Sequence, residues 1–210
     1  MDKTESNLLV RHVLFDADGV LQSTPGGFTN ALRRHLGNSV SDFRSHAGMR
    51  ESGVLDGATR FMPLLEQLLK DYGVKTPADK VFADAWESIE VNEPALGVVK
   101  ALRDREVGVH LGTNQCIERA DYMKKNMGYE NILQVRCYSC DMGVAKPEPE
   151  YFSEAALRIG APASEILFID DRENNVEGAK LAGMNAECWD LDQGIDVLWE
   201  VLGKYGFNRD

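Results

Sequence analysis

The chain alternates short apolar runs with longer segments in which apolar residues recur at helical spacing. Five of the apolar runs end in polar or glycine-containing turns, and they span Arg11–Phe15, Val107–Gly112, Ile132–Tyr138, Ile166–Ile169 and Asn185–Trp189. Runs this short and largely apolar are typical of strands that are covered on both faces. We therefore expect a parallel sheet between two layers of helices.

Helices are predicted between and after these strands, at Pro94–Arg105, Glu148–Ile159, Arg172–Leu181 and Ile195–Tyr205. Their ends carry ordinary signals, because Pro147 stands at the start of the second helix and Gly160 directly after it. Alternating strands and helices with short connections predict the α/β class, with a doubly wound parallel sheet and right-handed crossovers.

One stretch, between Val20 and Asn92, shows helical periodicity without a convincing strand. The amphipathic helices expected there are Phe28–Leu36, Thr59–Tyr72 and Pro77–Val91. This pattern predicts an all-α insertion between the first and second strands, joined by linkers that can hinge. We divide the chain into a core domain of residues 1–22 and 93–210 and an inserted helical domain of residues 23–92.

The composition is that of an ordinary globular protein, with 210 residues of which 43% are hydrophobic and 27% charged. A formal net charge of −11 argues against a nucleic-acid partner or an anionic membrane surface. Because no apolar segment approaches the length of a membrane span and no signal peptide is visible, we expect a cytoplasmic protein. A monomer is the default expectation, with a dimer as the alternative.

Cysteine usage raises one question, because Cys137 and Cys140 have C-x-x-C spacing. A zinc site would need two further ligands, and neither a second pair nor a nearby histidine supplies them. A redox pair normally opens a helix, whereas this pair ends a predicted strand. We expect ordinary buried thiols.

Polar residues that can take part in catalysis or metal binding follow the predicted strands at their carboxyl ends. An open parallel sheet has its functional crevice at those ends. These residues are Asp16, Asp18, Thr113, Asn114, Lys146, Asp170 and Asp171. Clustered carboxylates repel one another, and a divalent cation relieves that repulsion; Mg²⁺ prefers such oxygen ligands. The pattern therefore predicts a Mg²⁺ cofactor and a phosphorylated substrate.

Each of these residue types has a task in phosphoryl transfer. Asp16, held near the metal, can attack phosphorus in line and form an acyl phosphate. Asp18, two residues on, can protonate the leaving oxygen and later accept a proton from water. Thr113, with backbone N–H groups that open the next helix, and Lys146 can hold the phosphate oxygens.

Several of these residues also have simpler interpretations. Asp-x-Asp-Gly is a common turn, and Asn114 can be a helix N-cap or a loop brace instead of a phosphate ligand. In the insertion, Arg44, His46 and Arg50 are candidate substrate contacts, although a solvated helix face is the simpler explanation of them. Trp86 suits either the core or a specificity element.

The motifs resemble those of the haloacid dehalogenase-like (HAD) superfamily over about residues 10 to 190. Val13-Leu14-Phe15-Asp16-Ala17-Asp18-Gly19-Val20-Leu21 resembles the first motif, Leu111-Gly112-Thr113-Asn114 the second, Lys146-Pro147 the third and Phe168-Ile169-Asp170-Asp171 the fourth. The resemblance implies a Rossmannoid core and a helical cap formed by the insertion. It also implies a nucleophile at Asp16 and an acid/base at Asp18. Asp16, the backbone carbonyl of Asp18, Asp170 and Asp171 would then bind Mg²⁺, while Thr113 and Lys146 hold phosphate.

Within that superfamily, an acid at Asp18 disfavours dehalogenases and phosphonatases. The motifs look most like a branch with sugar-phosphate phosphatases and, nearby, the phosphatase domain of bifunctional epoxide hydrolases. One departure is Asn175, where many relatives carry aspartate. The resemblance implies a phosphatase acting on a small phosphorylated metabolite, for which a sugar phosphate is one candidate. The alternatives are a phosphomutase and a catalytically idle binding module.

Overall fold

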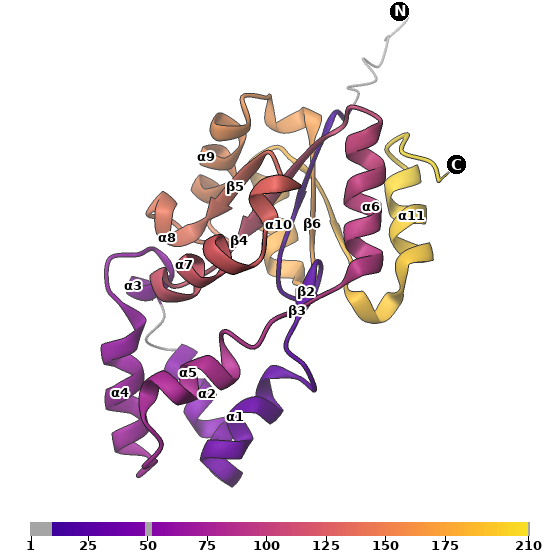
Figure 1. Cartoon of the computed structure of the whole chain (residues 1–210). Coiled ribbons are helices and arrows are strands. Elements are labelled where there is room, and N and C mark those ends of the chain that lie inside the picture. Colours follow the sequence, from indigo (N-terminus) through magenta and orange to yellow (C-terminus); the bar gives the residue numbers. More distant parts are fainter. Residues whose placement is uncertain (1–9, 49–51, 210) are drawn as a thin grey trace, which may run out of the picture.

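The computed structural model describes residues 10–48 and 52–209. Two bodies are visible in Figure 1, an α/β core and a smaller helical body below its sheet, and the chain passes between them twice. None of the helices within the described residues is long and apolar enough to cross a membrane.

The core is built on a five-stranded sheet in the order β5-β4-β1-β6-β7. Its strands are β1 (His12–Phe15), β4 (Gly108–Thr113), β5 (Val135–Tyr138), β6 (Ile166–Asp170) and β7 (Asn185–Cys188). All neighbouring pairs are parallel. The predicted α/β class and doubly wound parallel sheet are confirmed. The ends of all five strands differ from those of the predicted runs by three residues or fewer.

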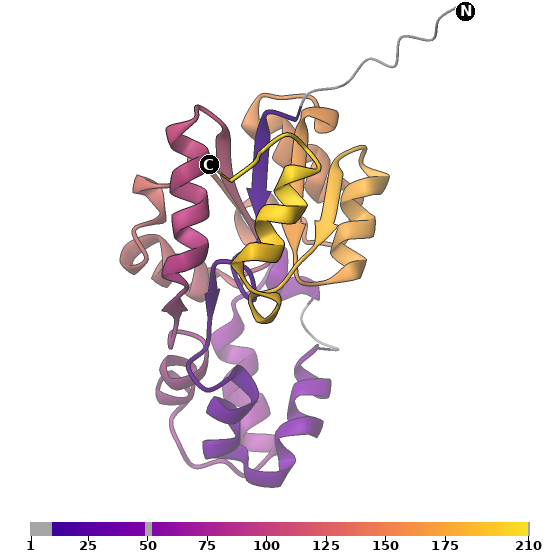
Figure 2. The same ribbon diagram turned by 90° about the vertical axis from the view of Figure 1, so that its right-hand side faces the viewer.

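Helices cover both faces of this sheet. Three of them, α6 (Glu93–Asp104), α7 (Ile117–Asn126) and α11 (Ile195–Gly203), share a buried cluster with alternate residues of the central strands, such as Val13, Phe15 and Leu167. On the opposite face, α9 (Pro149–Ile159) and α10 (Glu173–Leu181) pack against Leu14 and Phe168. Figure 2 shows α6 and α11 side by side in front of the strands.

Shorter elements complete the core. They are α8 (Ser139–Met142) and the 3-10 turns Tyr129–Asn131, Ala163–Glu165 and Leu191–Gln193. The turn at Tyr129–Asn131 explains why β5 begins at Val135 and not at Ile132. All four cysteines are free thiols, with Cys137 buried and Cys140 half-buried. Burial is the main reason that the pKa of each of these two thiols is raised to about 11.

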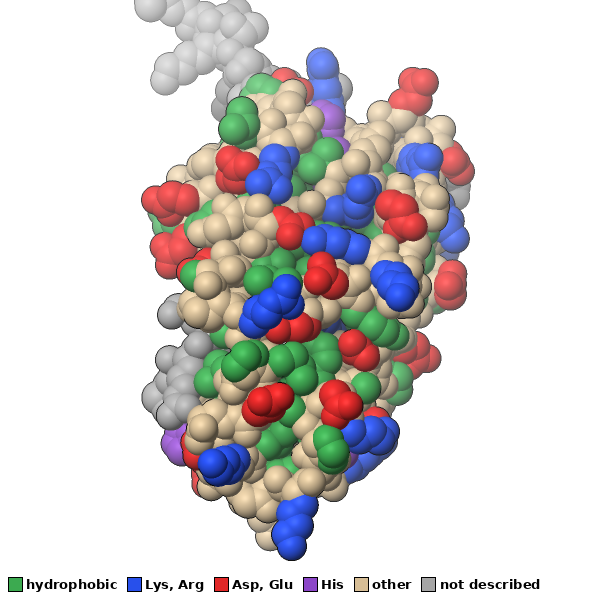
Figure 3. Space-filling model, turned by 60° about the vertical axis from the view of Figure 1, so that its left-hand side comes forward, with side chains coloured by type: hydrophobic (Ala, Val, Ile, Leu, Met, Phe, Trp, Pro, Cys, Tyr) green, Lys and Arg blue, Asp and Glu red, His purple; other side chains and the backbone are tan. Residues whose placement is uncertain are grey.

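The inserted helical body, which we call the cap, has a buried cluster of its own that includes Leu32, Phe43 and Leu65. Its elements are α1 (Phe28–Leu36), a 3-10 turn (Gly37–Ser39), α2 (Val40–Gly48), α3 (Ser52–Leu55), α4 (Phe61–Asp71) and α5 (Ala78–Ala85). The first predicted helix agrees with α1, whereas α5 ends well before Val91. In Figure 3, hydrophobic side chains show between the charged ones mainly over this cap half.

The two linkers between core and cap pair with each other, which corrects the expectation that this stretch has no strand. The two-residue strands β2 (Gln22–Ser23) and β3 (Glu90–Val91) are antiparallel, with Gln22 opposite Val91 and Ser23 opposite Glu90. A backbone bond from Asn92 N to Leu21 O, 2.9 Å, extends the pairing. The chain therefore leaves and re-enters the core through one ribbon. The division into residues 1–22 with 93–210 and residues 23–92 stays a prediction.

Two histidines, the half-buried His12 on β1 and the buried His110 on β4, are in contact in the core sheet. His12 Nδ1 and His110 Nε2 are 3.1 Å apart, and a Cβ on Gly108 would come within 2.0 Å of His12 Nδ1. Burial first, and then the neighbouring His12, lower the pKa of His110 to about 4.

We expect acid to destabilise the protein through His110. The unfolded chain binds its proton near pH 6.5 and the folded chain only near pH 4, so the stabilisation is complete above the first value and is lost as pH falls towards the second. The full effect is roughly 3 kcal/mol. Urea unfolding of the wild type and His110→Val across this window checks it, because the variant should show the shallower pH dependence. Equal slopes would contradict the assignment.

Candidate active site

The carboxyl ends of β1, β4 and β6 meet at the sheet edge that faces the cap. Between the two bodies lies a cavity of about 440 Å³. Its core side is lined by Asp16, Asp18, Thr113, Asn114, Lys146 and Asp171. The structure thus brings together six of the seven residues singled out in the sequence, and the seventh, Asp170, lies fully buried directly behind them.

Lys146 is the centre of the polar floor. Its Nζ donates to Asp16 Oδ1 at 2.7 Å, to Asp170 Oδ2 at 2.6 Å and to the carbonyl of Gly112 at 2.9 Å. The ammonium group is therefore fully satisfied by one neutral and two anionic acceptors. Burial opposes its charge, but Asp16 and Asp170 outweigh burial and raise the pKa of Lys146.

The carboxylate charge near Lys146 exceeds what one lysine can neutralise. Burial first, and repulsion by Asp170 in addition, raise the pKa of Asp16 despite the opposing charge of Lys146. Burial and Asp170 likewise raise the pKa of Asp171. One oxygen of each of Asp16, Asp170 and Asp171 lies within 4.8 Å of the others. Three converging carboxylates with an excess of negative charge fit a hard divalent cation such as Mg²⁺.

Close approach of the first motif to Asp171 depends on a glycine. Gly19 has φ +85°, and a Cβ there would come within 2.8 Å of Asp171 Oδ2. A side chain at this position would displace Asp171 or the turn. The Asp-x-Asp-Gly pattern is thus more than a common turn here, because its glycine lets the loop after β1 lie against the loop after β6.

The two residues that end β4 differ in their surroundings. Thr113 is 1% exposed, and its Oγ1 accepts from Gln115 Nε2 at 2.9 Å. Asn114 braces the Lys146 loop, because its Nδ2 donates to Lys146 O at 2.8 Å and its Oδ1 accepts from Lys146 N at 2.9 Å. These contacts favour the brace interpretation of Asn114, while Thr113 lies on the cavity floor.

Asp18 is held by side chains that the sequence did not single out. Arg119 Nη2 donates to Asp18 Oδ1 at 2.7 Å, and its Nη1 binds Oδ2. Gln115 Nε2 and Gln22 Nε2 each donate to Asp18 at 2.9 Å. Loss of water around the carboxylate would raise its pKa, but the charge of Arg119 and these hydrogen bonds outweigh it and hold the pKa of Asp18 well below its usual range.

The segment after the second motif could have pointed to this group. Gln115 lies two residues before α7 and Arg119 lies in its first turn, and Arg119 Nη1 donates to Gln115 Oε1 at 2.9 Å. Both follow Thr113 closely, and both line the cavity. Gln22 left no such signal, because its role depends on the β2–β3 ribbon.

The departure at Asn175 has a definite contact. Asn175 Nδ2 donates to Asp170 Oδ1 at 2.9 Å, and Arg172 N donates to the same oxygen at 2.9 Å. Asparagine thus supplies a donor where an aspartate would add another negative charge. The Asn175 amide binds one oxygen of Asp170, and Lys146 binds the other.

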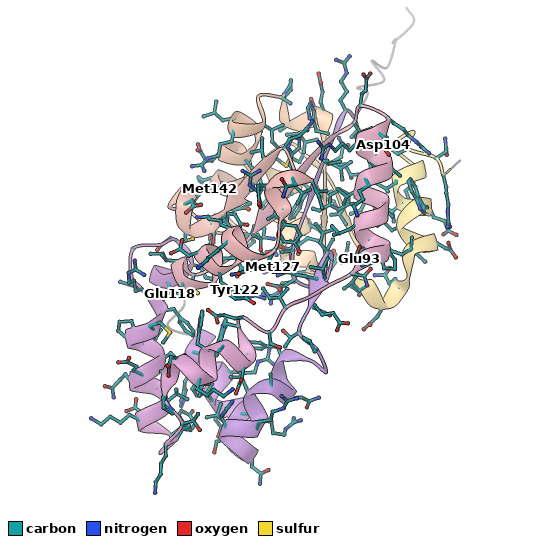
Figure 4. The ribbon with its side chains drawn as sticks, in the orientation of Figure 1. Glu93, Asp104, Glu118, Tyr122, Met127 and Met142 are labelled. Atoms are coloured by element: carbon teal, nitrogen blue, oxygen red, sulfur yellow. The ribbon has the colours of Figure 1, made fainter. Side chains whose placement is uncertain are left out.

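The start of α7 also binds the cap. Glu118, labelled in Figure 4 on the core side facing α4, accepts from Phe61 N at 3.2 Å and Met62 N at 3.3 Å. It thereby satisfies N–H groups in the first turn of α4. Arg119 Nε donates to the carbonyl of Trp86 at 2.6 Å. Adjacent residues therefore join the cap to the core.

The predicted cap contacts have different outcomes. Arg44 and Trp86 line the cavity. His46 is exposed and its Nδ1 is 2.6 Å from the hydroxyl of Tyr72, outside the cavity lining. Arg50 lies outside the described residues.

An open parallel sheet, a helical cap over its carboxyl edge and a carboxylate cluster around a buried lysine define a capped Rossmannoid hydrolase. The chain belongs to the haloacid dehalogenase-like hydrolases, because that family's pattern matches residues 10–183. The family resemblance noted in the sequence is confirmed.

Named relatives agree with this family. Bifunctional epoxide hydrolase 2 of Mus musculus is 26% identical over 84% of this chain, which spans only 36% of that protein. Phosphatase MT3486 of Mycobacterium tuberculosis is 28% identical, with 83% of this chain and 84% of the relative covered. A HAD family enzyme from Bacteroides thetaiotaomicron, solved with magnesium and inorganic phosphate, has a TM-score of 0.75 at 19% identity, covering 90% of this chain and 99% of that one.

Proposed function

We propose that the protein is a Mg²⁺-dependent phosphatase that hydrolyses a small phosphate monoester through an aspartyl phosphate on Asp16. The observation that carries the proposal is the group of three carboxylates around Lys146, open to a cavity under the cap. Relatives named as phosphatases support it. We place the reaction in the cytoplasm and keep the monomer as the default.

Mg²⁺ would be held by Asp16, Asp170 and Asp171, with the backbone carbonyl of Asp18 as a further ligand. When bound, the ion supplies positive charge that offsets the excess carboxylate charge and favours an ionised Asp16. Lys146 adds a fixed positive charge at the same floor, and Thr113 adds a neutral donor for a phosphate oxygen.

In the first half-reaction a carboxylate oxygen of Asp16 attacks phosphorus, and the bond from phosphorus to the ester oxygen breaks. The leaving oxygen takes a proton from Asp18, so the alcohol departs neutral. Asp16 then carries the phosphoryl group as an acyl phosphate.

In the second half-reaction water attacks the same phosphorus while Asp18 accepts a proton from it. The bond from phosphorus to the Asp16 oxygen breaks, which releases inorganic phosphate and restores the carboxylate. The ionised Asp18, bound by Arg119 and Gln115, matches the protonation state that this second half requires. The first half requires a protonated Asp18, so the ion pair with Arg119 must be loosened before that half begins and can form once Asp18 has given up its proton.

The proposal predicts Mg²⁺-dependent hydrolysis of a generic aryl phosphate. Activity should disappear with a chelator and return with Mg²⁺, and Mg²⁺ with beryllium fluoride should raise the thermal midpoint by forming the aspartyl adduct. Asp171→Asn should weaken activation by Mg²⁺ about tenfold or more, because a ligand is lost. Asp104→Asn, an exposed acid at the far end of α6 in Figure 4, is the control and should behave as wild type.

Three results would count against this proposal. Full activity in a chelator would remove the role of the ion. Absence of both turnover and the beryllium fluoride adduct would favour an idle binding module, and transfer of phosphate between hydroxyls of one sugar would favour the phosphomutase.

A further inference from the structure

The cap side of the cavity differs sharply from its polar floor. Most of the described side chains that line it are apolar: Phe28, Val54, Leu55, Phe61 and Trp86, with Cys116 at the core boundary. The phosphate-binding end is thus covered by a hydrophobic upper half. An ester bound there would have its phosphate among charges and its alcohol portion against carbon.

The aromatic part of this wall is held in place by ring contacts. Trp86 meets Phe28 edge-on with centroids 5.0 Å apart, and it meets Phe61 in a tilted arrangement at 5.0 Å. Behind it, Phe82 stacks on Trp86 at 5.7 Å and 7°. The bond from Arg119 to the Trp86 carbonyl fixes the backbone at the same point. The apolar wall is therefore preformed.

Polar groups on this side are few and lie at the linker or are already engaged. Among the described lining residues they are Ser23 and Thr24 in the linker and Arg44 on α2. Arg44 Nη1 donates to Thr29 Oγ1 at 2.7 Å, and its guanidinium lies 5.9 Å from the centre of the Phe28 ring. Its charge thus packs against the aromatic wall.

This lining discriminates between alcohols. Each sugar hydroxyl buried without a partner costs about 1–3 kcal/mol, whereas each apolar ring buried against carbon gains through the hydrophobic effect. A polyhydroxylated leaving group would leave several hydroxyls facing Phe28, Leu55 and Trp86. A ring can instead meet Trp86 and Phe28 in offset or edge geometry.

We propose that the natural substrate is a phosphate monoester of an alcohol that carries an aromatic ring, with the ring seated against Phe28, Phe61 and Trp86. The inference rests on the proposed phosphatase function and makes its substrate class more specific. It also replaces the sugar phosphate that we considered from the sequence. The cap side of the cavity presents mainly apolar side chains, whereas a sugar needs hydrogen-bond partners there.

Three primary alkyl esters test the class without a large difference in leaving-group basicity: phenethyl phosphate, ethyl phosphate and the primary phosphate ester of glucose. With Mg²⁺ present, kcat/KM for phenethyl phosphate should exceed that for ethyl phosphate by about tenfold or more, which a buried phenyl ring readily supplies. The glucose ester should not exceed ethyl phosphate. A glucose ester that is turned over better than phenethyl phosphate would overturn the inference.

A matched pair of cap variants tests whether the apolar wall causes the preference for phenethyl phosphate. Phe28→Ser should bring the phenethyl-to-ethyl ratio of kcat/KM towards one, mainly through a higher KM for phenethyl phosphate. Met62→Ser removes a side chain that also packs partly buried on the cap cluster but does not line the cavity, so it should keep the wild-type ratio. If Phe28→Ser does not fold, Trp86→Leu gives the same readout. An unchanged ratio in the folded variant would overturn the inference.

Failure of this inference differs from failure of the proposed function. A chain that hydrolyses ethyl phosphate with Mg²⁺ but prefers the glucose ester is still a phosphatase with another substrate class. A chain that hydrolyses none of the three esters and forms no beryllium fluoride adduct loses both proposals.

Discussion

Asp16→Asn should reduce kcat by about ten-thousandfold or more while leaving the fold intact. The amide keeps the shape of the side chain but lacks the anionic oxygen that attacks phosphorus. Steady-state hydrolysis of an aryl phosphate with saturating Mg²⁺ measures the loss, and circular dichroism establishes that the variant is folded. The beryllium fluoride adduct should be absent.

The same substitution separates activity from stability. Because burial and Asp170 raise the pKa of Asp16, its ionised form is a cost to the metal-free fold. Asp16→Asn should therefore unfold at the same or a higher temperature than the wild type in a chelator. Wild-type turnover in Asp16→Asn would remove the nucleophile from the mechanism.

Lys146→Met should cost the metal-free protein about 3–5 kcal/mol of unfolding free energy. The side chain is buried, and its loss leaves Asp16 and Asp170 without their shared cation. Urea unfolding in a chelator measures the change. Adding Asp170→Asn to the variant should recover part of it, because one uncompensated charge is removed.

Lys124→Met is the matched control for this prediction. Lys124 pairs with Asp141 at 2.8 Å, but both side chains are about 40% exposed, at 39% and 41%. Such a pair contributes about 1 kcal/mol or less. Similar losses for Lys146→Met and Lys124→Met would show that the Lys146 cluster is not the electrostatic centre that its burial implies.

The sheet and the polar floor were predictable because their signals are local. Each strand is a short apolar run, and Asp16, Thr113 and Asp170 stand at or directly after strand ends. Once the strands are parallel, topology alone brings those ends to one edge. The position of Lys146 followed from the same reasoning, although its three acceptors did not.

The cap shows where local signals weaken. The helix α2 was not predicted, since Ser41, Asp42 and Ser45 favour turns and caps over helix interiors. Its buried residues Val40, Phe43 and Ala47 nevertheless have helical spacing. Tertiary packing against the cap cluster overrides the poor propensity.

Contacts between distant segments were beyond the reach of sequence patterns. The pairs Arg119–Asp18 and Arg119–Trp86 join residues 101 and 33 positions apart. The β2–β3 ribbon likewise pairs two-residue segments that are too short to stand out. Such partners depend on how the cap is seated, which no periodicity specifies.

The adjacency of Glu118 and Arg119 limits how caps can be exchanged by grafting. A foreign cap needs an open helix terminus for Glu118 and a backbone carbonyl for Arg119, both at the spacing that one turn of α7 dictates. A transplant that lacks the carbonyl would leave Arg119 Nε without its acceptor next to Asp18, even with every core residue retained. Chimeras that do not satisfy Glu118 and Arg119 should therefore have a folded core and a folded cap but little activity.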